Sequence, residues 1–556
     1  MSNSVKKIVI VGGGSAGWLT AAYALYNLPN TQITLIESPN IPIVGVGEAT
    51  ILGFDHFLTE CGIPTELWTK ECDATIKLGT YFPNWRGDNK NIWQPFYFPI
   101  EKAETGNWHD FVDLCRDANV PFEDYEKWAA WYDVSVADKK IAGNTTACGK
   151  DANVGYHLDA VKLANFLSDY CNKKYPRLKH IKQHLMMPTI KDGNIEHVSL
   201  ENGDIITGDL FVDCTGFKRL LTNAIGNSEW VDRSHMLFTN AAVASQIDYE
   251  TEDEAQVPFV TAQACDHGWI WKTPVKDRIG SGLCYNSDIT SKQEAEDYFV
   301  QHWGEKRLRT GNFNHVPFKP EYNANNWRGN CFSVGLASGF IEPLESTGLA
   351  LLIIGSAGLK CLSKGGYTQQ DIDDFNFDMS NVYEDSMNFV ALHYFNNKRQ
   401  SQFWKHVDKH FEETEKMETI ATNYAKNFTP TVDAQFFPRN TEIFQDINWK
   451  LWLNTVGIKT ATAKLDTQGS SDGPSLSMRT TDAFAVSSAQ SGAEMVIGGT
   501  TNSPHTVWMQ NRHKSSNGYA YPIAINPLGG NVGIGTSNPD TCLLYTSPSP
   551  RDRTRS

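Results

Sequence analysis

The sequence is poor in positive charge, in patterned cysteines and in long apolar runs. It carries 49 Lys and Arg against 64 Asp and Glu, and the net charge of −15 argues against binding a nucleic-acid backbone. Its 11 cysteines are scattered without Cys-x-x-Cys pairs, so we expect reduced thiols rather than a disulfide frame, and we expect no metal site. No stretch of about 18 uncharged apolar residues suggests a membrane span. The first strand starts too early for a signal peptide, so we expect a cytoplasmic enzyme.

A glycine-rich turn near the start is the strongest local pattern. The apolar, β-branched run Lys7–Val11 predicts a strand, and Leu19–Tyr26 predicts an amphipathic helix. Between them the turn contains Gly12, Gly14, Ala16 and Gly17. Glycines in this arrangement let the backbone approach a pyrophosphate at the helix N-terminus. The pattern therefore predicts a dinucleotide site.

An acidic residue ends the next predicted strand. Ile33–Ile36 leads into Glu37, about 20 residues after the glycine-rich turn, where a carboxylate can accept a hydrogen bond from a ribose hydroxyl. A second glycine-containing stretch holds Gly47 and Ala49. It is either a loop that closes over the cofactor or a turn before a helix, and the residue types favour neither.

The run 73–82 alternates like a strand and contains Lys77. A strand lysine usually faces water, but a buried one would be a desolvated catalytic amine. Further along, the apolar stretch 210–212 ends at Asp213, in an Asp-x-x-Gly pattern typical of a second cofactor contact. Another strand and turn, 330–340, contains Gly335 and Leu336.

Two later motifs carry residues suited to chemistry. Trp269 and Trp271 fall on one face of a predicted strand, where they form either a rigid wall or ordinary core. In the stretch 341–350, Ser346, Thr347 and Gly348 stand at the start of a predicted helix and make an anion nest. Glu345 stands beside it.

Aromatic residues are frequent between residues 90 and 150 and again in 448–456, and either region suits a flat substrate or a plain core. From Lys459 the sequence is low in charge and rich in Ser, Thr, Gly and Asn. We predict a catalytic unit over 1–456 and a tail over 457–540 that resembles phage tail fibres. Residues 541–556 resemble translated sequencing adaptor.

Several motifs in the same order resemble the flavin-dependent tryptophan halogenases over roughly residues 5–456. The most specific is Trp269–Pro274, which matches the family's Trp-x-Trp-x-Ile-Pro with Thr273 in place of isoleucine. The resemblance implies an α/β, FAD-binding Rossmann-like fold of the flavin monooxygenase and halogenase type. It also implies a β-rich substrate region and a mainly helical C-terminal subdomain.

The resemblance implies a role for each matched residue. Lys77 would hold hypohalous acid, and Glu345 would orient or deprotonate partners. Thr347 and Gly348 would hold the halide, and Trp269 and Trp271 would separate flavin from substrate. Trp449, Trp452 and Phe96 would pack on the aromatic substrate. The residues implied to contact FAD are Gly12, Gly14, Ala16, Gly17, Glu37, Gly47, Ala49, Asp213, Gly335 and Leu336.

The implied reaction is halogenation of an indole, tryptophan-like or phenolic ring with reduced FAD, O2 and a halide. The sequence has one dinucleotide motif, so a separate flavin reductase is expected, and the family suggests a homo-oligomer. The stretch Gln94–Tyr97 stands where tryptophan-specific members tend to carry a histidine near the substrate ring, so their regiospecificity does not carry over. Two alternatives are a flavin monooxygenase acting on an aromatic or terpenoid substrate and, from the tail alone, a structural or carbohydrate-binding virion protein.

Overall fold

The computed structural model describes residues 3–41, 47–95, 154–251, 254, 257–414, 443–444 and 446–457, with four short strands between residues 484 and 521. The chain forms two compact units, Met1–Thr460 and Ala461–Ser556. In the second unit, the described backbone is one antiparallel sheet, β25-β26-β27-β28 (Phe484–Ser487, Ala493–Gly499, Val507–His513 and Ala520–Tyr521). The predicted division after residue 456 stays a prediction.

A six-stranded sheet forms the cofactor side of the first unit. Its order is β21-β22-β13-β2-β3-β9 (Trp327–Arg328, Cys331–Ser333, Leu210–Asp213, Lys7–Val11, Gln32–Glu37 and Leu178–Lys182). All neighbouring strands are parallel except β21 and β22. In β2, Ile8–Val11 are buried, which is typical of a parallel strand covered on both faces. The predicted Rossmann-like α/β fold is confirmed.

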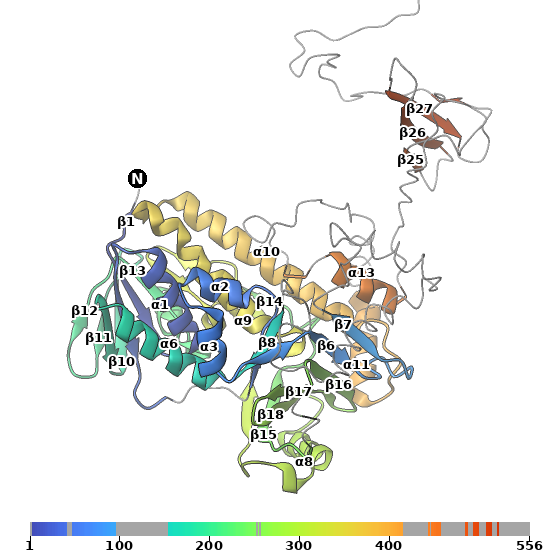
Figure 1. Cartoon of the computed structure of the whole chain (residues 1–556), viewed down its shortest axis with the longest axis horizontal. Helices are drawn as coiled ribbons and strands as arrows, with labels where there is room; N and C mark the ends of the chain where they lie inside the picture. Colours follow the sequence, from blue (N-terminus) through green and yellow to red (C-terminus); the bar gives the residue numbers. More distant parts are fainter. Residues whose placement is uncertain are drawn as a thin grey trace, which may run out of the picture. The chain divides into compact units, whose positions relative to one another are not determined.

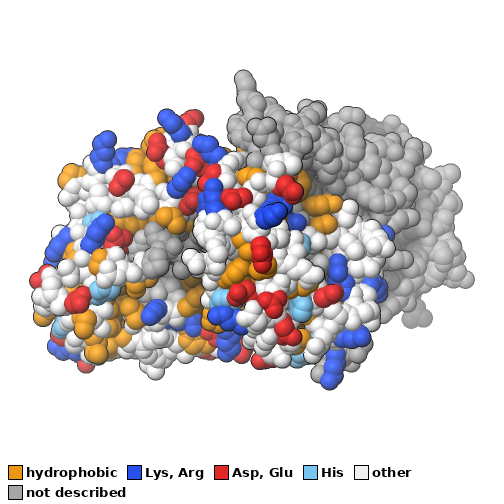
Figure 2. Space-filling view, turned by 90° about the horizontal axis from the view of Figure 1, so that it is seen from below, with side chains coloured by type: hydrophobic (Ala, Val, Ile, Leu, Met, Phe, Trp, Pro, Cys, Tyr) orange, Lys and Arg blue, Asp and Glu red, His pale blue; other side chains and the backbone are white. Residues whose placement is uncertain are grey.

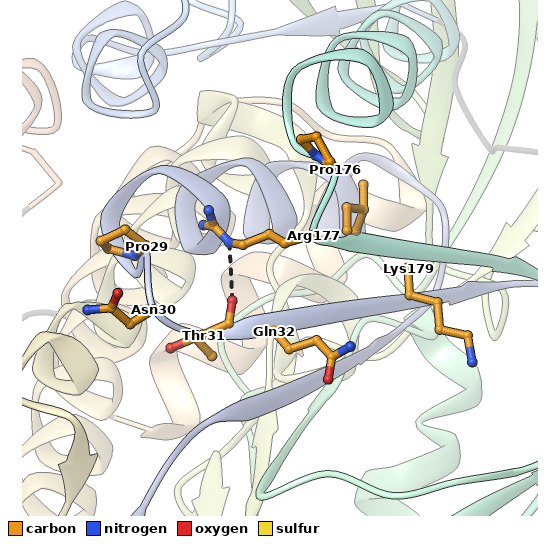
Figure 3. A pocket seen from close by; sticks show the side chains of 8 residues that line it. Pro29, Asn30, Thr31, Gln32, Pro176, Arg177 and Lys179 are labelled. Atoms are coloured by element: carbon orange, nitrogen blue, oxygen red, sulfur yellow. Dashed lines mark hydrogen bonds between the residues drawn. The ribbon is translucent and has the colours of Figure 1, made fainter.

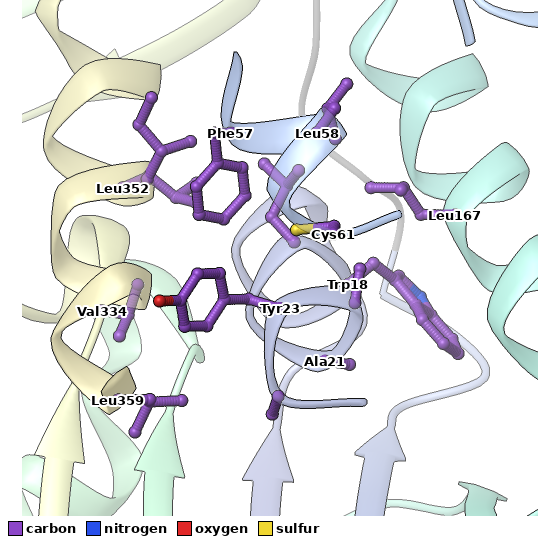
Figure 4. Packing of buried hydrophobic residues seen from close by; sticks show 14 of the residues in the cluster. Trp18, Ala21, Tyr23, Phe57, Leu58, Cys61, Leu167, Val334, Leu352 and Leu359 are labelled. Carbon is purple, nitrogen blue, oxygen red and sulfur yellow. The ribbon is translucent and has the colours of Figure 1, made fainter. Parts of the chain in front are cut away.

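Helix α1 (Ser15–Asn27) packs between α6 (Ala160–Lys174) and α9 (Thr347–Ala357), as Figures 1 and 4 show. Its Tyr23 side chain points toward Leu352 on the α9 side, while Trp18 lies on the side of Leu167 from α6 (Figure 4). Both α1 side chains are almost fully buried. This packing fixes the start of α1, and with it the glycine-rich turn.

A seven-stranded sheet forms the β-rich region. Its order is β19-β15-β18-β17-β16-β6-β7 (Asn314–Pro317, Ala241–Ile247, Arg278–Tyr285, Gly268–Val275, Val260–Cys265, Gly79–Phe82 and Ile92–Pro95). Helix α8 (Lys292–Trp303) packs on β15 and β18 through Phe299 and Trp303. The predicted β-rich region is present.

The run 73–82 is not the single strand that its alternation predicts. It divides into β5 (Thr75–Lys77), in the small sheet β4-β8-β5, and β6, in the seven-stranded sheet. The other strands of the small sheet are β4 (Glu48–Ala49) and β8 (Gly155–Leu158). The chain changes sheets at Leu78, whose N–H donates to the carbonyl of Pro258 at 2.8 Å. This change of sheet places Lys77 in a corner between the two sheets.

Helices dominate the C-terminal part of the first unit, as predicted. They are α9, α10 (Gln369–Tyr394), α11 (Gln402–Thr414) and α13 (Asp446–Thr455). Helix α10 starts with a capping box in which Thr368 and Asp371 each accept a backbone N–H of the other. Its last turn is buried and ends at His393 and Tyr394, which brings these two side chains into the core.

Shorter elements connect these layers. The helices are α2 (Phe54–Glu60), α3 (Thr65–Glu71) and α7 (Leu220–Ile225), with 3₁₀ turns η3 (Gly216–Lys218), η5 (Glu305–Arg307), η6 (Gly335–Ala337), η7 (Pro343–Glu345) and η8 (Gly358–Lys364). The minor sheets are β1-β24 (Asn3–Ser4 and Gly366–Tyr367), β10-β11-β12 (Leu185–Lys191, Asn194–Leu200 and Ile205–Ile206) and β14-β20-β23 (Trp230–Asp232, Glu321–Asn323 and Gly339–Phe340).

The charge distribution on the surface and one apolar helix are relevant to the expectation that the protein binds neither nucleic acid nor membrane. Acidic and basic side chains are interspersed on the face shown in Figure 2. Among the described residues, one segment, Thr347–Lys364, could cross a membrane by length and composition, with a mean hydropathy of 1.3. Within the structure 56% of this segment is buried, and its first eleven residues are the core helix α9.

A pocket of about 560 Å³ lies at the end of the sheet opposite the glycine-rich turn (Figure 3). It is lined by residues from the starts of β3 and β9, including Gln32 and Lys179. Arg177 in its wall donates to the carbonyls of Thr31, at 3.2 Å, and of Leu25 near the end of α1. Arg177 thereby fastens α1 to the sheet, and the pocket is separate from the predicted cofactor side.

Candidate active site

The glycine-rich turn between β2 and α1 leaves room for a ligand. Gly12 has φ of +120°, and a Cβ there would lie 2.2 Å from the carbonyl oxygen of Cys214. A Cβ on Gly17 would lie 1.8 Å from the carbonyl oxygen of Gly12. A Cβ on Gly14 would meet nothing within 4 Å. Backbone packing thus requires glycine at positions 12 and 17. Gly14 instead faces open space at the start of α1, where a pyrophosphate fits.

Glu37 reaches the glycine-rich turn from the end of β3. A Cβ on Gly13 would lie 2.0 Å from Oε2 of Glu37, so the carboxylate packs directly on the turn. Oε1 of Glu37 is 2.8 Å from Nε2 of His180 and 3.5 Å from Nζ of Lys182. Burial opposes ionisation, but the hydrogen bonds and charges of His180 and Lys182 outweigh it and lower the pKa of Glu37. The carboxylate is therefore charged and fixed beside the turn.

Of the other residues expected to contact FAD, Gly335 and Ala16 come together. Gly335 has φ of +66°, and a Cβ there would be 3.0 Å from that of Ala16; Leu336 follows it in η6. Gly47, with φ of +135°, lies instead against Gly280 of β18, and Ala49 pairs with β8. Ala49 thus lies in the small sheet in which β8 also pairs with β5, the strand that contains Lys77.

The side chain of Asp213 is tied into the turn that follows its strand. It ends β13 as expected, but it is fully buried and its carboxylate accepts five hydrogen bonds from the chain. Oδ1 accepts from the N–H and the hydroxyl of Thr215, and Oδ2 accepts from the N–H of Leu221 and from the N–H and hydroxyl of Thr222. Asp213 therefore shapes the turn after β13, and its contact with the cofactor stays a prediction.

Lys77 is a buried amine rather than a surface lysine. Its side chain is 0% exposed, and its Nζ donates to the carbonyl of Thr50 at 3.2 Å and to Oγ of Ser346 at 2.9 Å. Burial lowers the pKa of Lys77 to about 7, against the opposing charge of Glu345. An amine with this pKa is both a proton donor and a nucleophile at neutral pH.

Glu345 ends the 3₁₀ turn η7 and faces the same corner. It is buried, and its Oε1 lies 2.6 Å from Nε2 of His393. Its Oε2 is buried with no hydrogen-bond partner among the described residues, so this oxygen is left for a ligand. The next residue, Ser346, has φ of +58°, a strained conformation for a non-glycine residue and one that clusters at functional sites.

Thr347 and Gly348 stand at the N-terminus of α9, directly after this strained residue. Thr347 is buried, and its Oγ1 has no partner within the described part of the chain. A Cβ on Gly348 would meet nothing within 4 Å. Free N–H groups and an unused hydroxyl at a helix N-terminus suit a small anion.

Known proteins match this chain over nearly the whole first unit. A family model, tryptophan halogenase, matches residues 7–470. Tryptophan 6-halogenase ThaL of Streptomyces albogriseolus is 34% identical over 73% of this chain and 79% of its own length. Tryptophan 7-halogenase RebH of Lentzea aerocolonigenes is 31% identical over 80% and 87%. The solved structure of BrvH, a flavin-dependent halogenase from Brevundimonas sp. BAL3, superposes with a TM-score of 0.69 at 28% identity, covering 83% of this chain and 91% of its own.

The chain belongs to the tryptophan halogenase family. It is therefore a flavin-dependent halogenase that uses reduced FAD, O2 and a halide, with a separate flavin reductase and an aromatic substrate. The open face of Gly14, the fixed Glu37 and the free helix end at Thr347 fit FAD and a halide.

The halogenase's two motif tryptophans lie side by side on β17. The ring centroids of Trp269 and Trp271 are 6.1 Å apart, so they share a face of the strand as predicted. Trp269 is fully buried, and Trp271 lies flat over Gly282 of β18, where a Cβ would be 2.1 Å from the indole. A glycine at this position is thus required to seat the second tryptophan.

The predicted substrate residues of this halogenase are partly placed. Trp449 and Trp452 are buried on α13, and the Trp452 ring lies 3.7 Å from the ring of His393, centroid to centroid. The indole N–H of Trp452 donates to Oε1 of Gln94 from β7. Phe96 and most of the aromatic region 90–150 lie outside the described residues.

The sequence does not predict the contacts that Ser346 and His393 make within the site. Ser346 belongs to the predicted anion nest, but its bond to Lys77 joins residues that are 269 positions apart in sequence. His393 lies 48 residues from Glu345 in sequence. A histidine in the buried last turn of a helix was the available signal, and it is common in structural cores as well.

Proposed function

We propose that this enzyme halogenates an electron-rich aromatic ring with hypohalous acid delivered to Lys77. The observation that carries the proposal is the position of the Lys77 amine. It is fully buried, has a pKa of about 7 and bonds to Ser346, the residue between Glu345 and the helix that starts at Thr347. An oxidised halogen, a proton donor and a proton acceptor can thus meet in one corner.

The cofactor and halide would be held by the residues described above. When bound, reduced FAD supplies with O2 the two-electron oxidation that converts halide and a proton to hypohalous acid, with one water released. Gly12, Gly14 and Gly17 provide the backbone cradle, and Glu37 accepts from the ribose. The backbone N–H groups at Thr347 and Gly348 hold the halide.

Lys77 and Glu345 would carry out the transfer to the ring. The Lys77 ammonium donates a proton to the oxygen of hypohalous acid, so that water leaves as the halogen bonds to a ring carbon. Oε2 of Glu345 faces the positive charge that develops on the ring and accepts the proton lost from that carbon. The ring recovers its aromaticity, and the amine is reprotonated from solvent.

The substrate would be an indole or a phenol, with tryptophan as the first to test. The curated relatives ThaL and RebH are a tryptophan 6-halogenase and a tryptophan 7-halogenase. In this chain Gln94 fixes Trp452 by accepting its indole N–H, and no histidine occupies that position. We therefore propose an indole-like ring as the substrate.

The remaining features stay proposals as well. We propose that the enzyme is cytoplasmic, forms a homo-oligomer and binds neither nucleic acid nor membrane. We also propose that the low-charge tail 457–540 is related to phage tail fibres. Size-exclusion chromatography of the full chain and of a chain ending at residue 456 would show whether the tail affects assembly.

The test is a set of halides with L-tryptophan and a phenol, using reduced FAD, O2 and mass spectrometry. We expect a halogenated product that requires halide and is lost in Lys77→Met and strongly reduced in Glu345→Gln. Oxygenated product at every halide concentration would instead indicate a monooxygenase. Halogenation that persists in Lys77→Met would refute the role of the amine.

A further inference from the structure

Among the described residues, His393 is the one hydrogen-bond partner of the Glu345 carboxylate. Its Nδ1 lies 2.8 Å from the carbonyl oxygen of Phe389, one turn earlier in α10, and its Nε2 lies 2.6 Å from Oε1 of Glu345. His393 and Glu345 are both 0% exposed. Both ring nitrogens are therefore engaged inside the protein, away from water.

The proton count of this pair follows from its neighbours. A carbonyl oxygen can only accept, so Nδ1 of His393 must carry a proton to bond to Phe389. At 2.6 Å, Nε2 and Oε1 of Glu345 share one further proton, which resides on either the ring or the carboxyl. The pair thus holds one mobile proton and has no net charge in either arrangement.

The imidazole cannot turn away from this arrangement. Trp452 packs on its ring at a centroid distance of 3.7 Å, and Phe389 lies edge-on at 4.9 Å. The indole N–H of Trp85 donates to the backbone carbonyl of His393 at 2.7 Å. Glu345 is consequently held with Oε1 bound to His393, while its buried Oε2 has no hydrogen-bond partner among the described residues.

We propose that His393 is the positioning residue that makes Glu345 a proton acceptor, because it takes up the charge that the reaction releases. This inference rests on the proposed halogenation. As the ring C–H bond breaks, its electron pair returns to the aromatic system and the proton binds Oε2 of Glu345. The shared proton then settles on Nε2, so the positive charge resides on the imidazolium and Glu345 remains neutral. Without this transfer, a buried carboxylate must take the proton alone.

Two substitutions separate positioning from proton sharing. In His393→Gln the side-chain amide can still donate to Glu345 but cannot accept a second proton, whereas His393→Asn keeps only the donor to Phe389. The measurement is the single-turnover halogenation rate of tryptophan carrying hydrogen or deuterium on the indole ring. We expect His393→Gln to slow halogenation by about a hundredfold. Its hydrogen-to-deuterium rate ratio should rise well above the ratio near unity expected for the wild type.

One control variant and two possible outcomes make the test decisive. Adding His393→Gln to Glu345→Gln should cost little more than Glu345→Gln alone, since His393 acts through Glu345. Full activity of a folded His393→Gln with no isotope effect would overturn the inference. A wild type that makes no halogenated tryptophan would refute the proposed reaction on that substrate instead.

A measurement on the wild type covers the case in which the variants do not fold. With ¹⁵N-labelled histidine, the FAD-loaded enzyme should show a far-downfield hydrogen-bond proton on one imidazole nitrogen. That resonance should disappear in Glu345→Gln, which keeps the geometry but removes the shared proton. Its absence in the wild type would overturn proton sharing.

Discussion

Replacing Lys77 by methionine should stabilise the protein and abolish its activity. In the folded state, burial lowers the pKa of Lys77 to about 7 from a usual value of 10.5. The unfolded chain therefore binds more protons than the folded chain between pH 7 and 10.5, and Lys77 makes stability rise with pH in that window. Below pH 7 both states are protonated, and the full cost of burying the ammonium is present.

The size of the effect follows from the two pKa values. The cost is about 4 kcal/mol at pH 7 and about 2 kcal/mol at pH 9. Methionine has a similar length and no charge, so it removes this cost. It also removes the hydrogen bonds to Thr50 and Ser346, which are worth about 1 kcal/mol each. The net stabilisation should be about 2 kcal/mol at pH 7 and near zero at pH 9.

The assay is urea unfolding of wild type and Lys77→Met at pH 6, 7, 8 and 9, at one fixed FAD concentration. Lys191→Met is the matched control, because the side chain of Lys191 is 67% exposed, and it should change stability by less than about 0.5 kcal/mol at every pH. A difference between Lys77→Met and wild type that does not vary with pH would refute the desolvated amine. Destabilisation at pH 7 would refute it too.

The remaining predictions concern the cofactor cradle, the tryptophan motif and a second buried acid. Gly14→Ala, which adds a methyl group in open space, should leave the unfolding free energy within about 0.5 kcal/mol but weaken FAD binding about tenfold or more, as fluorescence titration would show. Gly17→Ala should instead destabilise the protein itself by about 1–3 kcal/mol. Gly282→Ala should displace Trp271 and, if that indole screens the flavin, raise the share of oxygenated product in mass spectra. Burial raises the pKa of Glu342 to about 7 from 4.5, so wild-type stability falls by about 3 kcal/mol as pH rises from 4.5 through 7. Glu342→Gln should flatten that part of the urea profile; an unchanged profile would refute the assignment.

The parts of the site predictable from sequence are those made by neighbouring residues. The turn from Gly12 to Gly17 is local, because a strand, a turn and a helix follow within one short stretch. The predicted anion site at Thr347 and Gly348 is local for the same reason, since a helix N-terminus needs no distant partner. The resemblance located Lys77, but alternation alone placed it in a longer strand, where it could equally have faced water.

What the sequence could not provide is the long-range pairing that sets the electrostatics. Lys77 is buried because the chain leaves one sheet for another at Leu78. The hydrogen bond that fixes this change is donated by the N–H of Leu78 to the carbonyl of Pro258, 180 residues away in sequence. Asp213 has the residue type of a cofactor contact, but its role depends on five donors that the following turn supplies. Neither fact has a signature in hydrophobic periodicity.

A site built this way works against the stability of its own fold near neutral pH. The free energy of unfolding falls as pH rises toward 7, because buried Glu342 must then ionise. The cost of burying the Lys77 ammonium disappears only above pH 7. Both costs are therefore present near pH 7, where the proposed halogenation uses the amine in both protonation states. Ser346, which follows the 3₁₀ turn after Glu342 and bonds to Lys77, is also held at a positive φ. This cost is tolerated because the last turn of α10 holds both acids: Tyr394 donates to Glu342 at 2.6 Å and the adjacent His393 bonds to Glu345. Variants selected only for stability should therefore lose charge at this turn before they lose it elsewhere in the core, and they should lose halogenation with it.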